Sequence, residues 1–459
     1  MQTDKILSQI WRDVGLPDDC LNAMEFLGSD AVLPSSFDVT RAASAAIAAT
    51  GLAAALLWRE RSGTMQNVRV AHRHAAAAFH SESFLRINGQ WAPREWGDIA
   101  GLYPTANGGW VRLHTNFDHH RAAILALLGC DGTRAMVAAE LLRRDSFVFE
   151  ALAVEANATV SAMRSFAQWD ALPHAQAVPS LPLVEITRIG AAPRPAWREG
   201  AAPLSGIRVL DLTRVIAGPV GTRTLAAHGA EVLGITGPGL PSYGIEDLGR
   251  GKRQAQLELT TEVGRAQMKA LLAGADVFVQ GYRPGAIAAH GFSAEQAVAI
   301  RPGLIVASLS AYGAAGPWAG RRGFDSLVQN ASGFNHAEAE AYGQDAPRPL
   351  PVQALDHATG YLLAFGIMAA LYRRSLDGGS WQVRVSLART GHWLRGLGRR
   401  HETIGLPPQA NEDVVAFLEP SDSGFGRMEA IRHPALLSDT PAILVLPSVQ
   451  LGTHAAVWA

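Results

Sequence analysis

The sequence predicts an α/β protein built around a parallel β-sheet. Three observations support this class. Strand-like and helix-like segments alternate after residue 204, a Pro- and Gly-rich boundary at 191–206 precedes them, and two distant segments repeat a helix, turn and strand pattern. Such alternation is typical of a parallel sheet with helices on both faces. With 459 residues the chain is long enough for two or three domains and a large core.

The boundary contains Pro193, Pro195 and Pro203, which interrupt any helix or central strand. Beyond it, the short apolar runs 207–212 and 230–235 read as strands, and 219–228 between them reads as a helix. This is a βαβ unit. Further strands are expected at 275–280 and 304–310, and further helices at 285–290 and 359–373.

The internal repeat aligns residues 39–70 with 354–385 without a gap. It brings Gly51 onto Gly366 and Gly63 onto Gly378, and both copies contain the triplet Val-Arg-Val in the expected strand. Chance agreement between two Ala-rich helices is the alternative, but the matching turn and strand lie outside the Ala-rich stretch. Residues 42–58 are therefore expected to form a buried core helix rather than a membrane span, although their length is near the lower limit for a span.

Between the copies, residues 101–117 read as a hairpin with an Asn-Gly-Gly turn, followed by a helix at 120–128. The tail from 419 to 458 is rich in Pro, Gly and Ser and is expected to be an extended arm.

Composition narrows the classes of partner. The formal charge of -1 and the pI near 7.0 predict no nucleic-acid partner and no membrane surface. Cys20 and Cys130 are the only cysteines and form no ligand pattern, so no metal site and no disulfide is expected. Residues 1–20 carry charges throughout and lack the apolar core of a signal peptide, which predicts a cytoplasmic protein.

Six segments in order after residue 202 resemble the class III CoA-transferase family, also called the carnitine dehydratase and bile-acid-inducible protein family. The resemblance implies a Rossmann-like CoA domain, a smaller α+β domain and commonly an interlocked dimer. It also implies coenzyme A and acyl-CoA as substrates, with a carboxylic acid as acceptor and no permanently bound cofactor. The segments are PLSGIRVLDLTRVIAGPVGTRTLAAHGAEVL, GRGKRQAQLEL, ADVFVQGYRPGAIAAHGFS, RPGLIVASLSAYGAAGP, RRGFDSLVQNASGF and ALDHATGYLLAFGIMAALYRR.

Asp356, in ALDHATG, stands where this family carries its catalytic Asp. A carboxylate can attack an acyl-CoA thioester to give a mixed anhydride, and the released CoA thiolate can then give an aspartyl-CoA thioester. With an ordinary pKa of about 3.9, Asp356 would be ionised at neutral pH without an adjacent base. Backbone amides at Gly360 or at the Ser332-Gly333 turn are candidate oxyanion donors. The alternative role for Asp356 is a helix N-cap.

For the coenzyme, the loop at 214–221 lacks GxGxxG, so no dinucleotide fingerprint is expected. In the family the corresponding loop, which holds Ile216 and Ala217 here, approaches CoA. The resemblance also assigns residues of GRGKR and GYRPG to CoA, where fixed cations suit phosphate oxygens. Solvated surface charge is the alternative for the cations. These residues are Lys252, Arg253, Tyr282 and Arg283.

The enzyme alternative within the family is a racemase, isomerase or lyase. Racemisation needs a His and an Asp as paired acid and base, and Phe324 stands at the aligned His position. His357 neighbours Asp356, but adjacent residues at a helix start point in different directions, so a surface or capping role is expected.

The amino-terminal copy places Arg41 opposite Asp356, so it cannot perform the same chemistry. We therefore interpret 1–95 as a degenerate partial copy, 96–200 as the small domain and return segment, 204–400 as the CoA-binding catalytic domain and 401–459 as the arm. The domain order is permuted. The chain could form a homodimer, or be a monomer that imitates one through its duplication, and a catalytically inactive CoA-binding protein stays a second hypothesis.

Overall fold

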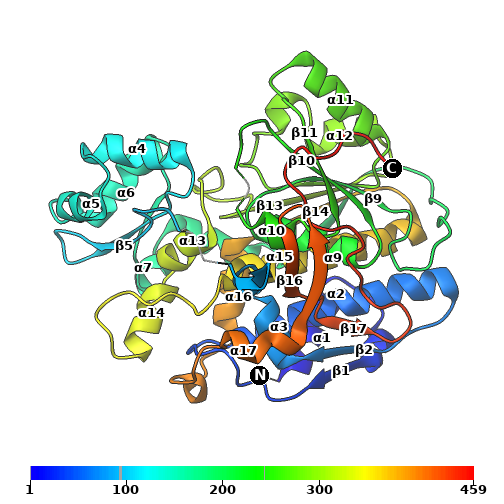
Figure 1. Ribbon diagram of the computed structural model, residues 1–459, viewed down its shortest axis with the longest axis horizontal. Helices are drawn as coiled ribbons and strands as arrows, with labels where there is room; N and C mark the ends of the chain where they lie inside the picture. The colour runs from blue at the N-terminus through cyan, green and yellow to red at the C-terminus, as the bar shows by residue number, and fades with distance from the viewer. Residues whose placement is uncertain (1, 93–95, 242) are drawn as a thin grey trace.

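The computed structural model describes residues 2–92, 96–241 and 243–459, and it confirms the α/β class (Figure 1). Its main element is a seven-stranded sheet with the order β11-β10-β9-β12-β13-β14-β8. All neighbouring strands are parallel except β14 and β8, which pair antiparallel. The strands are β8 (Glu185–Gly190), β9 (Arg208–Leu212), β10 (Glu231–Thr236), β11 (Lys252–Gln256), β12 (Val277–Gln280), β13 (Ile305–Ser310) and β14 (Ser380–Ser386).

Helices cover both faces of this sheet because successive strand residues point to opposite sides. Val209 belongs to the cluster that includes α9 (Ala217–Ala227) and α15 (Ala354–Asp377). Leu210, the next residue, belongs to the cluster on the other face with α11 (Glu262–Ala273) and α12 (Ala294–Ile300). Both residues are fully buried, so the strands read as continuous apolar runs.

Two elements differ from the sequence prediction. Strand β11 was not expected, because its sequence KRQAQ is polar; Lys252 and Gln254 are nevertheless buried and have polar partners. The helix expected at 285–290 is reduced to a single 3₁₀ turn at Ala288–His290. Pro284 and two glycines flank this segment, and they favour turns over helix.

The repeated segments have the same local structure. Helix α2 (Val39–Ser62) and helix α15 each have 24 residues, and each ends at a glycine with positive φ, Gly63 and Gly378. Each helix is followed by a strand, β2 (Val68–Ala71) or β14. Strand β2 pairs in parallel with β1 (Met24–Leu27) and antiparallel with β17 (Ala435–Leu437). Strand β14 likewise pairs in parallel with β13 and antiparallel with β8.

The aligned glycines inside the two helices have equivalent surroundings. A Cβ atom on Gly51 would lie 2.7 Å from Cγ1 of Val68, and one on Gly366 would lie 2.8 Å from Cγ1 of Val383. Val68 and Val383 are themselves aligned by the repeat. Each helix therefore needs glycine at this position to approach the strand that follows it, and this shared constraint supports the duplication independently of the Ala-rich composition.

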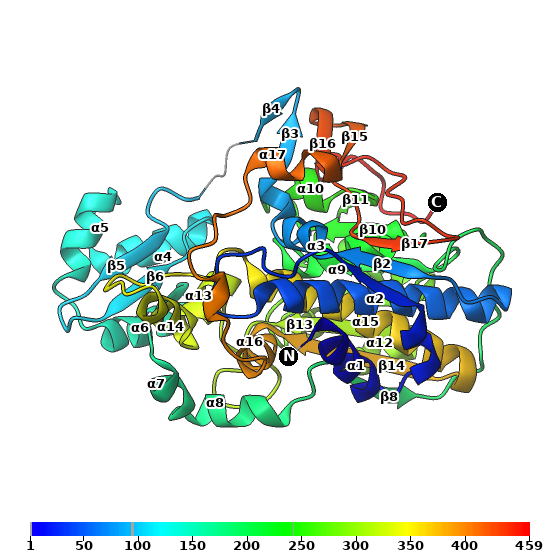
Figure 2. The same cartoon turned by 90° about the horizontal axis from the view of Figure 1, so that it is seen from below.

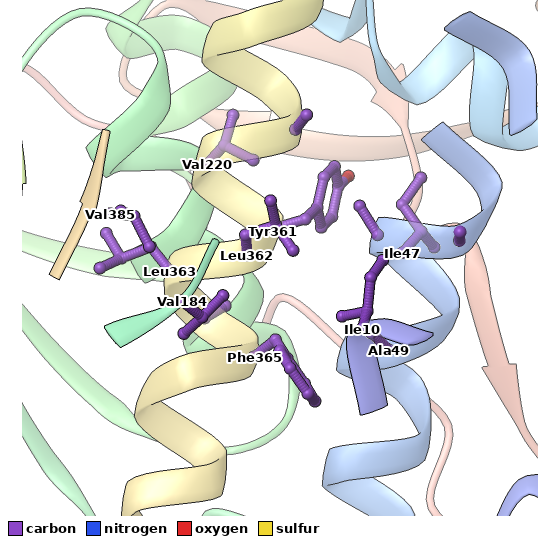
Figure 3. Packing of buried hydrophobic residues seen from close by; sticks show 14 of the residues in the cluster. Ile10, Ile47, Ala49, Val184, Val220, Tyr361, Leu362, Leu363, Phe365 and Val385 are labelled. Carbon is purple, nitrogen blue, oxygen red and sulfur yellow. The ribbon is translucent and has the colours of Figure 1, made fainter. Parts of the chain in front are cut away.

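The two repeat helices lie side by side in the centre of the molecule (Figure 2). Tyr361 and Phe365 point from α15 toward α2 and α1 (Thr3–Asp13), where Ile47 and Ile10 lie (Figure 3). Both helices are long and apolar enough to cross a membrane, but 94% and 100% of their most apolar windows are buried inside the protein. Both are core helices here.

A smaller α+β unit forms from the middle of the chain and lies to one side of the sheet (Figure 1). Its three-stranded sheet, β5-β6-β7, packs with α4, α5 and α6 around a separate apolar cluster. These elements are β5 (Gly101–Pro104), β6 (Trp110–Leu113), β7 (Val160–Ala162), α4 (Asp118–Leu128), α5 (Arg134–Leu141) and α6 (Ser146–Glu155).

The tail contains three short strands and an extended end. Strands β15 (Leu418–Ser423) and β16 (Gly426–Ile431) form a sheet with β3 (Leu85–Ile87) and β4 (Gln90–Trp91). The last residues run along the large sheet, where His454 donates its amide to Gln254 and Trp458 donates to Leu271. The expected domain boundaries at 95, 200 and 400 stay predictions. The first of them, at residue 95, lies outside the described residues. The remaining helices are α3 (His72–Ala78), α7 (Phe166–Asp170), α8 (Pro173–Ala177), α10 (Ile245–Leu248), α13 (Asp325–Ala331), α14 (Phe334–Ala341), α16 (Leu387–Gly396) and α17 (Asn411–Val414).

Candidate active site

The candidate site is a cavity of about 370 Å³ at the carboxyl ends of β9 and β12. From β9 the chain builds the sheet outward through β10 and β11, then crosses back to place β12 on the other side of β9. Ligands in open α/β sheets bind at such a reversal of strand order, because the loops there diverge and leave a crevice. The small unit closes the other side of this cavity with residues that precede and begin α4.

Five of the seven predicted site residues line this one cavity. They come from three places in the chain: the loop before α9, the loop after β12, and the first turn of α15. A neighbouring cavity of about 260 Å³ shares Tyr282 and Arg283, so the two cavities meet at the loop after β12. The five are Ile216, Ala217, Tyr282, Arg283 and Asp356.

Lys252 and Arg253 do not line the cavity. The ammonium of Lys252 is buried 3.1 Å from Oδ2 of Asp211 and also bonds to Thr222 and the Pro219 carbonyl. Its charge is therefore compensated inside the protein, where it ties β11 to β9 and α9. Arg253 donates to the carbonyl of Val457 in the extended tail. Neither position agrees with the expected phosphate contact, because both side chains are engaged elsewhere.

Asp356 is the third residue of α15, and 8% of its surface is exposed. The N-cap of this helix is Gln353, so the N-cap interpretation of Asp356 is wrong. The amides of the first turn are instead satisfied from another helix: the amide of Asp356 donates to Oδ2 of Asp325, at 2.8 Å, and the amide of Leu355 also bonds to this carboxylate. The Asp356 carboxyl group is thus left to face the cavity.

A close helix crossing places Asp356 beside the loop that precedes α9. A Cβ on Gly360 would lie 2.4 Å from the carbonyl oxygen of Ala217, and one on Gly221 would lie 2.8 Å from the carbonyl oxygen of Gly360. Only glycine allows the two backbones to approach this closely. Gly360 is one turn from Asp356, so the crossing fixes the distance between Asp356 and the start of α9. This packing role also means that Gly360 lies inside a helix and not at the cavity.

The loop before α9 contains a strained residue. Val215 has φ of +70°, a left-handed conformation that is a rare outlier for a β-branched residue. Val215 lines the cavity together with Ile216 and Ala217, where α9 begins. Strain of this kind persists where the surroundings hold it, often beside a ligand site. The turn places the start of α9 at the cavity wall, and a helix N-terminus favours negative charge.

Asp356 and Asp325 are a pair of buried carboxyl groups. Burial raises the pKa of Asp325 to about 6, although its hydrogen bonds oppose this change. Burial also raises the pKa of Asp356 well above its ordinary range, and the negative charges of Asp325 and Glu82 add to the effect. Asp356 therefore does not have the ordinary carboxyl pKa that the sequence analysis assumed, because burial and two neighbouring negative charges oppose its ionisation.

Glu82 lies in the amino-terminal segment of the chain, after the aligned repeat of residues 39–70, and reaches the start of α15. Its Oε2 lies 2.9 Å from Nε2 of His357, the residue after Asp356. His357 is fully buried and stacks on Phe79, so it is not the surface histidine that was expected. The carboxylate is partly buried, and His357 holds the pKa of Glu82 below its ordinary value against the effect of burial. The amino-terminal segment thus supplies a charged group to the environment of Asp356.

Two histidines that the sequence analysis did not single out as site residues contact Phe324. His114 stacks on Phe324 at 3.7 Å between ring centroids, and His120 packs against it edge to face. Burial lowers the pKa of His114 and of His120 to about 3. Both imidazoles are therefore neutral at physiological pH, which makes them poor proton carriers.

The position in the first copy that corresponds to Asp356 carries an ion-pair network. Arg41 bonds to Asp30, at 2.5 Å, and to Asp38, at 3.2 Å. Arg400 approaches the same two carboxylates at 3.1 and 3.4 Å. The repeated helix therefore starts with a closed network in one copy and a carboxyl group at a cavity in the other.

Comparison with known proteins identifies the family. The model of CoA-transferase family III matches residues 29–200 and 204–398. The match covers most of the chain, so the protein belongs to this family, and the division into two segments is compatible with the partial duplication.

Several curated relatives are CoA-transferases by name, and the chain spans about half the length of those it matches. It is 32% identical over 269 residues to an acetyl-coenzyme A transferase of Hypoxylon pulicicidum, which covers 55% of this chain and 45% of the relative. It is 37% identical over 191 residues to the human succinyl-CoA:glutarate CoA-transferase, with 38% and 43% covered. A crystal structure of a hypothetical protein from Mycobacterium tuberculosis is 33% identical, with 43% and 58% covered and a TM-score of 0.39.

Proposed function

We propose that this protein is a CoA-transferase that moves CoA from an acyl-CoA to a carboxylic acid, with Asp356 as the nucleophile. The observation that carries the proposal is that Asp356 is the sole acidic residue among the described residues that line the cavity at the reversal of strand order. Membership of CoA-transferase family III supports the reaction class.

The proposed reaction begins when the Asp356 carboxylate attacks the thioester carbonyl of a bound acyl-CoA. This forms a mixed anhydride between Asp356 and the acyl group and releases the CoA thiolate. The thiolate then attacks the aspartyl carbonyl, which gives an aspartyl-CoA thioester and the free donor acid. An acceptor carboxylate attacks this thioester, and the returning thiolate completes the new acyl-CoA and restores Asp356.

Each attack develops negative charge on a carbonyl oxygen, which needs hydrogen-bond donors held in place beforehand. Gly360 packs inside a helix crossing, and Gly333 packs against Phe166, so neither suits this role. The first amides of α9, at Ile216 and Ala217, are better candidates because they start a helix at the cavity wall.

The raised pKa of Asp356 gives the proposal a testable pH dependence. Only the ionised carboxylate can attack, and burial together with Asp325 and Glu82 opposes ionisation. The same desolvation makes the ionised form a stronger nucleophile than a hydrated carboxylate. The rate of acyl transfer to Asp356 should therefore increase with pH over a range that lies above the ordinary titration range of an Asp side chain.

CoA exchange between two acids tests the proposal. The protein is incubated with one acyl-CoA and an excess of a different free carboxylic acid, and the products are separated by chromatography. The proposal predicts a new acyl-CoA, its absence with Asp356→Asn, and no release of free CoA in the first turnover. Hydrolysis without formation of any new thioester, across short and branched acids, would argue for a thioesterase. CoA binding without turnover would argue for a binding protein.

A further inference from the structure

Two arginines on the wall of the cavity have positive charges that no described residue compensates. Arg214 lies in the loop after β9 and Arg322 lies three residues before Asp325. Neither forms an ion pair with a described carboxylate, whereas Arg321 beside them pairs with Glu150 at 3.3 Å. A buried Nη1 of Arg214 and a buried Nε of Arg322 also have no hydrogen-bond partner among the described residues.

The two guanidinium groups flank one pair of rings. Arg214 lies 5.3 Å from the ring centroid of Phe117, and Nη1 of Arg322 lies 3.1 Å from Nε2 of His120. Phe117 and His120 are themselves 5.4 Å apart. Both charges also act on the neighbouring His119. Burial lowers the pKa of His119, and the positive charges of Arg322 and Arg214 lower it further. The positive field is therefore concentrated at one part of the cavity wall.

Neutral histidines cannot compensate this field. His120 accepts from Arg322 and is uncharged at physiological pH, because burial is the main cause that lowers its pKa to about 3. Asp356 is the single carboxyl group among the described residues that line the cavity, and burial together with neighbouring negative charges raises its pKa well above the ordinary range, which opposes its ionisation. An anionic ligand is the remaining source of negative charge, and Arg presents a planar fork that fits a carboxylate.

The anionic groups of the substrates differ in whether they keep their negative charge throughout the reaction, and this difference decides which of them needs a fixed cation. The reacting carboxyl group of an acid loses its charge when it becomes a thioester or an anhydride, so it does not need a fixed cation throughout the cycle. A second carboxylate on the same acid keeps its charge in every state. The phosphates of CoA are separated from the thioester by the pantetheine arm, and exposed Arg283, where the two cavities meet, is better placed for them.

We propose that Arg214 and Arg322 form a subsite for the second carboxylate of a short dicarboxylic acid, so that the substrates of this protein are dicarboxylic acids and their mono-CoA thioesters. The inference rests on the proposed function and adds the substrate class. It gives Arg214 and Arg322, which the sequence analysis did not single out, the role of binding the acyl group.

Two thioesters of equal chain length test the subsite. Succinyl-CoA and butyryl-CoA both carry four-carbon acyl groups, but only the first ends in a carboxylate. Acyl transfer to Asp356 is measured for both in the wild type, Arg214→Gln, Arg322→Gln and Arg322→Lys. Arg143→Gln is the control, because that exposed side chain pairs with Glu140 on the surface, away from the cavity lining.

We expect the wild type and the control to favour succinyl-CoA by at least about tenfold in rate at low substrate concentration, the size expected for a charge-assisted bond. Each Gln variant should lose most of this preference, because its rate with succinyl-CoA falls much more than its rate with butyryl-CoA, while Arg322→Lys should keep part of the preference. The thermal unfolding transition shows whether each variant folds. If one Gln variant does not fold, the Gln variant of the other arginine decides whether the subsite exists. Equal rates with both thioesters in the wild type, or a preference that survives both Gln variants, would overturn the subsite.

Binding of CoA itself, measured by calorimetry, separates the two sources of negative charge. An unchanged affinity supports the acyl subsite. A similar loss of affinity for CoA and for both thioesters would overturn it in favour of a phosphate contact. Adducts that form equally from both thioesters leave the transferase proposal intact, whereas adducts from neither would overturn that proposal and the subsite with it.

Discussion

The amide of Asp356 donates a 2.8 Å hydrogen bond to Oδ2 of Asp325, which joins the first turn of α15 to the first turn of α13. The bond gives α15 a cap from outside its own sequence and holds two buried carboxyl groups side by side. Asp325 therefore has two effects on Asp356: it positions the backbone and it opposes ionisation of the side chain.

Replacing Asp325 by Asn should shift the pH dependence of adduct formation at Asp356 toward lower pH. The amide oxygen of Asn can still accept the Asp356 amide, but the negative charge that raises the pKa of Asp356 is removed. The rate of acyl-enzyme formation, followed by quenched mass spectrometry between pH 5 and 9, checks this. An unchanged profile would show that Asp325 acts only as a cap. Asp18→Asn, which alters an exposed surface pair, is the control.

Replacing Asp356 by Asn should stabilise the protein more at pH 8 than at pH 5. Asp356 binds its proton more tightly in the folded than in the unfolded state, because its folded pKa is raised. Its contribution to stability is therefore full below its unfolded pKa and is lost as pH rises toward the folded pKa. Asn cannot ionise and avoids this loss. Thermal unfolding at the two pH values measures the difference, and an equal effect at both would contradict the raised pKa.

Replacing Gly360 by Ala should reduce stability by about 1–3 kcal/mol, the usual cost of overpacking. The added Cβ would lie 2.4 Å from the carbonyl oxygen of Ala217, so α9 and α15 must separate. Acyl transfer should fall by roughly 100-fold, since small displacements of reacting groups are costly. Gly396→Ala is the matched control, because apart from its own helix backbone and chain neighbours no described atom lies within 4 Å of the added Cβ. Equal activity of both variants would show that the crossing does not position Asp356.

Replacing Glu82 by Ala should shift the pH dependence of acyl transfer to Asp356 toward lower pH, because it removes a negative charge that opposes ionisation of Asp356. The change removes the acceptor of fully buried His357 and should cost about 1–3 kcal/mol, the cost of an unsatisfied buried group. Glu82→Gln keeps an acceptor and should recover most of the stability. Glu25→Ala, at an exposed position of the amino-terminal segment, controls for general effects. A wild-type pH profile in Glu82→Ala would mean that this segment is only a scaffold.

Replacing Lys252 by Met should destabilise the protein by roughly 3–5 kcal/mol, as expected when one partner of a buried ion pair is removed. In the fraction that folds, CoA affinity should remain within about twofold of wild type, because Lys252 does not line the cavity. Arg283→Gln should show the opposite result, with normal stability and weaker CoA binding. Denaturant titration and calorimetry on both variants make the comparison, and weaker CoA binding by folded Lys252→Met would restore the phosphate role.

The parallel sheet and both repeat helices could be predicted because their signals are local. Apolar runs separated by turns define β9, β10, β12 and β13, and shared glycines align α2 with α15. Strand β11 could not be predicted, because Lys252 is buried only through its contacts with Asp211 and Thr222 from distant segments.

The candidate site was predicted in part for the same reason. Asp356, Tyr282 and Arg283 lie in motifs that the family resemblance covers, and Asp325 lies in another of those motifs, RRGFDSLV, without having been singled out. No sequence motif pointed to Glu82, because its contact with His357 depends on how the amino-terminal segment packs against α15. The sequence likewise could not show that no described carboxylate pairs with Arg214. Nor could it show that Phe117 of the small unit lies against its guanidinium group at the cavity.

Intact-protein mass spectrometry after mixing with a panel of acyl-CoAs tests the central claim most directly. The wild type and Asp356→Ala are compared at several pH values from 6 to 9, with peptide mapping of any adduct. We predict an acyl or CoA mass on the wild type, located at Asp356, formed faster at higher pH and absent from Asp356→Ala. An adduct on the variant, or no adduct on a wild type that demonstrably binds CoA, would contradict nucleophilic catalysis by Asp356.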